Sequence, residues 1–106
     1  MAGNTIFEVK FDGGTTGAAV NIRLLPIGTH HWENVLLSPH NKDEKYLVDG
    51  IYDIQWMFTG PDADAGITIT ITDTDTGKPV RPPIVDHIPA GKTAWTDVSR
   101  FMIPGA

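Results

Sequence analysis

The chain has 106 residues with 8 basic and 13 acidic side chains, so its net charge is −5 when histidine is neutral, and this length predicts one compact domain over residues 1–106. The acidic balance argues against nucleic-acid binding, because that affinity comes mainly from Lys and Arg contacts with phosphates. Cysteine is absent, which excludes disulfides, thiolate metal sites and cysteine nucleophiles.

The composition and the first third of the chain both favour β-strands. Thr, Ile and Val make up 30 of the 106 residues, and their branched side chains suit a pleated surface better than a helix. Residues 5–11 alternate between apolar and polar side chains and end at a turn signal, Asp12-Gly13-Gly14. Residues 20–26 repeat the pattern, and residues 32–37 form a third, less regular candidate strand.

The clearest strands lie in the middle of the chain. Residues 52–58 place Tyr52, Ile54, Trp56 and Phe58 on one face, which predicts a core position for the indole of Trp56. Residues 67–72 alternate isoleucine with threonine, so the isoleucines form a second core stripe. The core is expected to end near Thr72, because the same register would bury the carboxylates that follow.

The last third of the chain is less regular. Residues 78–83 contain three prolines, so this segment is predicted to be an extended crossing or an edge. A short strand is expected at residues 84–88. Residues 92–103 mix helical and alternating spacing, which predicts an irregular turn followed by a final strand. The fold prediction is all-β, a single-domain antiparallel β-sandwich of seven or eight short strands, with a small closed β-barrel as the alternative.

Catalytic motifs are scarce. The serines are Ser38 and Ser99, and neither lies in a nucleophile turn. Asp86 and His87 are neighbours on a predicted strand, so their side chains should point to opposite faces. A small hydrolase or isomerase would need Asp and His residues brought together by folding. The chain is therefore expected to be noncatalytic and to need no cofactor.

Two Asp-x-Asp-x-Gly motifs, residues 62–66 and 73–77, raise the alternative of a bound calcium ion. Neither motif continues into the EF-hand pattern, and both lie where hairpin turns are needed, for which Asp and Gly are ordinary residues. Turn formation is the favoured interpretation. The second motif, through Asp73 and Asp75, leaves a calcium-assisted carbohydrate-binding module as an alternative function.

The segment richest in candidate binding residues runs from Gly28 to Lys42. His31, Trp32 and His40 fall within it, on or beside predicted loops, and loops often carry binding residues. The tryptophan could form a stacking platform, and the histidines could supply directional hydrogen bonds. The alternative is that Trp32 closes the edge of the core while the histidines are solvated.

These patterns predict a noncatalytic module that binds a protein or a glycan through loops at one end of the sandwich, with His31, Trp32 and His40 as contacts. No apolar run is long enough for a membrane-spanning helix, so membrane insertion is not expected. A homo-oligomer is possible. The absence of a signal-like N-terminal segment favours a cytoplasmic origin, although a chain after signal removal would look the same.

Overall fold

The computed structural model describes residues 3–12, 19–35, 37, 41–59, 66–88 and 92–104, and these residues form strands, turns and extended segments. No helix suited to crossing a membrane occurs in these residues. The structure contains eight strands, β1 (Gly3–Asp12), β2 (Ala19–Pro26), β3 (Glu33–Val35), β4 (Lys42–Leu47), β5 (Gly50–Thr59), β6 (Gly66–Asp73), β7 (Ile84–His87) and β8 (Ala94–Ile103).

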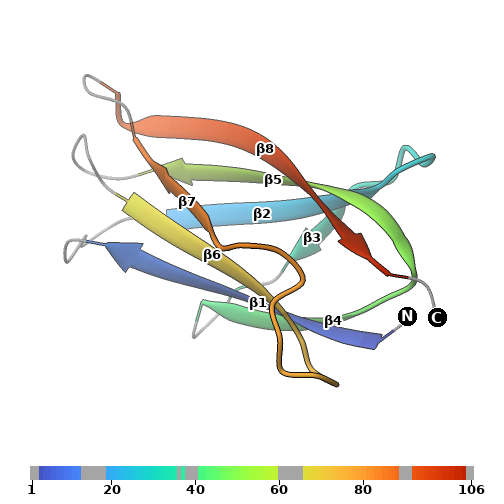
Figure 1. The fold of residues 1–106 in the computed structure, drawn as a ribbon. Helices are drawn as coiled ribbons and strands as arrows, with labels where there is room; N and C mark the ends of the chain where they lie inside the picture. Colours follow the sequence, from blue (N-terminus) through green and yellow to red (C-terminus); the bar gives the residue numbers. More distant parts are fainter. Residues whose placement is uncertain are drawn as a thin grey trace.

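The strands form two antiparallel sheets of four, in the orders β4-β1-β6-β7 and β3-β2-β5-β8. Figure 1 shows the two sheets as layers that face one another. Each sheet keeps two edge strands, so the predicted β-sandwich is confirmed and the alternative closed barrel is wrong. The longest pairing in the second sheet joins β5 to β8 and continues from Gly50 opposite Ile103 to Thr59 opposite Ala94.

The core lies between the sheets and is built from alternate residues, as the sequence predicts. The inward positions of β1, β2, β5 and β6 supply most of it, and the outward positions between them are exposed or half-buried. Trp56 is 3% exposed, which confirms its predicted core position. The buried apolar residues are Phe7, Val9, Ile22, Leu24, Val35, Leu47, Tyr52, Ile54, Trp56, Phe58, Ile67, Ile69, Ile71, Ile84, Ile88, Phe101 and Ile103.

Two strands differ from the sequence prediction. β4 was not predicted, because it opens with four consecutive charged residues and buries only Leu47; it is an edge strand paired with β1 alone. Charged edge strands are common because the charges discourage pairing with another chain. Residues 92–103 are more regular than predicted, since only Lys92 and Thr93 precede the strand and β8 is continuous from Ala94 to Ile103. Asp97 and Ser99 occupy core-side positions of β8 and obscure its alternation.

Polar contacts link the two sheets along the side where β7 and β8 are the edges. The indole Nε1 of Trp56 donates to Asp86 Oδ2 on β7 at 2.8 Å. Arg81, in the extended proline-rich segment, donates from Nη1 to Ser99 Oγ and to the backbone oxygen of Arg100, the latter at 3.0 Å. Within β8 itself, Asp97 Oδ1 accepts from the amide of the next residue, Val98, at 2.8 Å. These bonds occupy backbone groups in the middle of the edge strand β8, which hinders strand addition there.

Candidate functional site

The outer face of sheet β3-β2-β5-β8 carries the most distinctive surface in the described residues. Side chains alternate along each strand, so the positions between core residues point away from the core. Pairing places Arg23 of β2, Gln55 of β5 and Val98 of β8 in one row across the sheet. The adjacent row contains Leu25, Asp53 and Arg100. Polar and apolar groups are thus held at fixed spacing on a regular surface.

Trp32 lies at one side of this outer face, immediately before β3. Asn34 pairs with Arg23, so the alternation of β3 puts Trp32 on the same face as Arg23. The guanidinium carbon of Arg23 lies 4.1 Å from the centre of the indole ring. This cation–π contact helps to hold both side chains in place. Trp32 as a whole nevertheless remains 38% exposed, so part of the residue is open to a partner.

Hydrogen bonds within the sheet orient the polar groups beside Trp32. Arg23 Nε donates to Gln55 Oε1, and Arg100 Nε donates to Asp53 Oδ1 at 2.9 Å, forming an ion pair. Each guanidinium therefore uses its Nε within the sheet.

A shallow depression lies on this outer face beside Trp32. Its lining consists of Trp32, Asp53, Gln55, Val98, Ser99 and Arg100. An aromatic ring, an amide, a carboxylate and a guanidinium thus converge on one place, and this set offers both donors and acceptors beside an apolar surface. The arrangement can bind, because the groups are mutually bonded and preorganised.

Known proteins provide no further guide. Comparisons with protein-family models, curated proteins and solved structures find no match to this chain. The assignment of function therefore depends on the chemistry of the site alone.

The structure places only one of the three predicted contact residues at the depression. Trp32 lines it, whereas His31 is exposed and is not part of its lining. His40 lies outside the described residues. Arg23, Gln55 and Arg100 were not anticipated as site residues, although their outward positions on predicted strands were a usable signal. What the sequence could not supply was the cross-strand pairing that brings them beside Trp32.

The second Asp-x-Asp-x-Gly motif forms a hairpin turn. Asp73 Oδ1 accepts from the amide of Asp75 at 3.0 Å, and Oδ2 accepts from Thr76 Oγ1 at 3.3 Å. Gly77 has a φ of 68°, which glycine adopts without strain. No cluster of three or more His, Asp or Glu side chains suited to a metal occurs in the described ranges. The first motif's residues 62–65 lie outside them.

Asp86 and His87 do not form a catalytic pair in the structure. The Asp86 carboxylate accepts from the indole of Trp56 through Oδ2 and from the backbone amide of His87 through Oδ1. The His87 side chain is exposed and follows the alternation of β7 to the opposite face. The geometry therefore gives the hydrolase or isomerase alternative no supporting pair at this position.

Proposed function

We propose that this protein is a noncatalytic glycan-binding module that uses the outer face of sheet β3-β2-β5-β8. The observation that carries the proposal is the partly exposed Trp32 beside a depression lined by Gln55, Asp53 and Arg100. Sugar rings have an apolar C–H face that packs against an aromatic ring, and their hydroxyls need donors and acceptors at the ring's edge. The outer face supplies both.

The fixed geometry of the polar groups supports this proposal. Arg23 is bonded to Gln55 and Arg100 to Asp53 before any ligand arrives. A ligand then loses less affinity to the ordering of side chains, because that entropy has been lost on folding. Guanidinium groups suit paired recognition of a sugar carboxylate, so acidic glycans belong in the test set beside neutral ones.

The test is a glycan array that contains neutral and uronic-acid oligosaccharides, followed by calorimetric titration of the best binder. Trp32→Ala should weaken binding by about 30-fold, which corresponds to a cost of about 2 kcal/mol for a central contact residue. Its free energy of unfolding should change by less than about 1 kcal/mol, because the side chain is outside the core.

Tyr46→Ala is the matched control. Tyr46 is an exposed aromatic residue, 66% accessible, on the edge strand β4 of the other sheet. Its removal should leave glycan binding unchanged. If no glycan binds, or if Tyr46→Ala and Trp32→Ala weaken binding equally, the proposed site is wrong.

A protein partner is the second candidate, and a specific observation favours it. Four further exposed apolar side chains lie at outward positions of β5 and β8 on the same sheet, namely Ile51, Met57, Val98 and Met102. Protein interfaces are enriched in Trp, Met and Arg, and contiguous apolar surface marks interaction sites. Met57→Asp separates the two candidates, because it should abolish binding of a protein across the whole sheet face while leaving the depression at Trp32 intact.

A further inference from the structure

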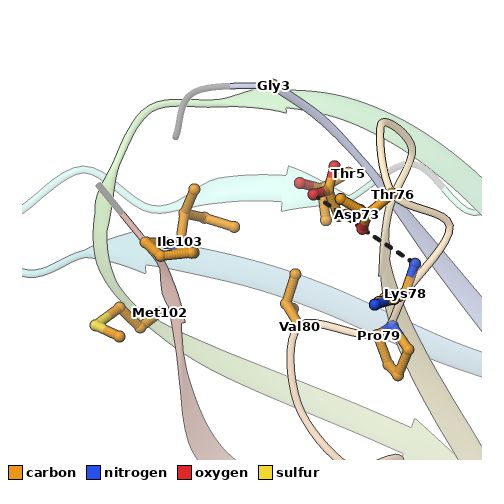
Figure 2. Close-up of a pocket in the computed structure, with 10 residues that line it drawn as sticks. Gly3, Thr5, Asp73, Thr76, Lys78, Pro79, Val80, Met102 and Ile103 are labelled. Carbon is orange, nitrogen blue, oxygen red and sulfur yellow. Dashed lines mark hydrogen bonds between the residues drawn. The ribbon is translucent and has the colours of Figure 1, made fainter. Parts of the chain in front are cut away.

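A second concave site lies at the end of the sandwich where β1 begins and β8 ends. It is a cleft of about 400 Å³ between the two sheets, within the range usual for small-molecule sites. Figure 2 shows Met102 and Ile103 on one side and Val80 and Pro79 on the other. Most of the lining is apolar. The cleft does not share a lining residue with the depression at Trp32.

One wall of the cleft is fixed by the hairpin turn between β6 and the proline-rich segment. The amide and the hydroxyl of Thr74 both donate to the backbone oxygen of Asn4, each at 3.1 Å. The turn packs closely against this end of β1, since a Cβ at Gly3 would lie 3.2 Å from Asp75 Oδ2. The amide of Val80 donates to Ile71 at 2.9 Å and holds the opposite part of the wall. These hydrogen bonds fix the position of the wall.

Thr5 supplies the polar group that points to a ligand. It occupies a core-side position of β1, in line with Phe7 and Val9, and is 2% exposed. The Thr5 hydroxyl makes no hydrogen bond with any described residue, and its oxygen is accessible to solvent. The residue lines the cleft. A buried hydroxyl normally has a partner. Because the Thr5 oxygen is open to the cleft, a molecule bound there can hydrogen-bond with it.

The charges at the cleft limit what that occupant can be. Asp73 and Lys78 both line it, and Asp75 lies beside Gly3 at its margin. Two carboxylates against one ammonium disfavour an anion. Both oxygens of Asp73 already accept hydrogen bonds within the turn, so this carboxylate is a poor partner for a ligand cation.

We infer that the cleft binds a small neutral molecule with an apolar body and one hydroxyl or carbonyl group. The apolar body packs between Val80 and Ile103, and the polar group hydrogen-bonds with Thr5 Oγ1. This site is independent of the glycan-binding proposal, because it shares no lining residue with the depression at Trp32.

The test is an NMR titration with phenol as the probe, followed through the methyl signals of Thr5, Val80 and Ile103. Phenol should shift these signals in a saturable manner. Toluene, which lacks the hydroxyl, and benzoate, which is anionic, should each bind more weakly. Thr5→Val keeps the shape of the side chain and should weaken phenol binding by about threefold to tenfold, the value of one neutral hydrogen bond.

Val80→Phe should fill the cleft and abolish the saturable shifts. Val85→Phe is its matched control, since Val85 is 69% exposed on β7 and does not line the cleft. Shifts that rise linearly to the solubility limit of phenol would overturn the inference, as would binding that is insensitive to Thr5→Val. If Val80→Phe does not fold, Thr5→Val still tests the hydrogen bond between phenol and the cleft.

Discussion

Replacing Trp56 with alanine removes the side chain that both fills the centre of the second sheet and links it to the first. Trp56 is buried on the core face of β5, and its Nε1 donates to Asp86 Oδ2 at 2.8 Å. Truncation therefore leaves a cavity and removes the donor for a half-buried carboxylate. Cavities from tryptophan or phenylalanine truncation cost about 3–5 kcal/mol, and a domain of this size has only about 5–15 kcal/mol of stability.

Urea denaturation followed by far-ultraviolet circular dichroism measures this effect. With a slope of about 2 kcal/mol per molar urea, the midpoint of Trp56→Ala should fall by about 2 M. Trp56→Phe retains most of the volume and removes only the donor, so it should lose less. A double-mutant cycle of Trp56→Phe with Asp86→Ala should give a coupling energy of about 1 kcal/mol.

A loss below about 1 kcal/mol for Trp56→Ala would refute the reasoning, because it would mean that the indole is not part of a close-packed core. A coupling energy near zero would refute the role of the hydrogen bond alone. The matched control is Trp32→Ala, which removes the same side chain from the outer face and should leave the midpoint nearly unchanged.

Three further perturbations follow from the fold. Burial, and then the charge of Glu33, raise the pKa of Tyr52 above its usual value of 10.0. The folded state therefore favours the protonated phenol more than the unfolded state does. The contribution of Tyr52 to stability is complete below about pH 10 and is lost as pH rises through the folded pKa. The free energy of unfolding should therefore fall in alkaline titration, with a smaller slope in Tyr52→Phe. The double variant Arg81→Ala/Asp97→Ala frees backbone groups of β8 and should increase self-association in sedimentation velocity; an unchanged monomer would contradict the edge-protecting role. Gly77→Ala should destabilise by about 1 kcal/mol in thermal unfolding because of its positive φ, and an unchanged or higher melting temperature would show that the turn adapts.

The strands that the sequence predicts well are those with a strong alternation of apolar and polar residues. β5 and β6 contribute long inward stripes, so their faces follow from period two alone. β4 and β8 are edge strands, and their patterns reflect different forces. Four charged residues protect β4, and polar contacts with Arg81 replace apolar packing in the middle of β8. The alternation of period two arises when one face of a strand is buried and apolar, so it is weak in edge strands that carry polar residues on both faces.

The candidate binding site was only partly predictable for a different reason. Trp32 was recognisable by residue type, but its partners come from β2, β5 and β8, which are distant in sequence. Their convergence depends on strand order and register, which the pattern of a single strand does not specify. The cleft at Thr5 depends in the same way on the packing of the β6 hairpin against β1.

The central claim, that glycans bind on the outer face beside Trp32, is tested most directly by an NMR titration that locates the bound sugar. The probes are neutral and uronic-acid hexasaccharides, added to the ¹⁵N-labelled protein. The largest shifts should appear at the indole N–H of Trp32, the side-chain amide of Gln55 and the Nε–H of Arg23, and Tyr46 on the other sheet should not respond. Absence of shifts with every sugar, or shifts centred on Thr5 and Val80 instead, would contradict the account.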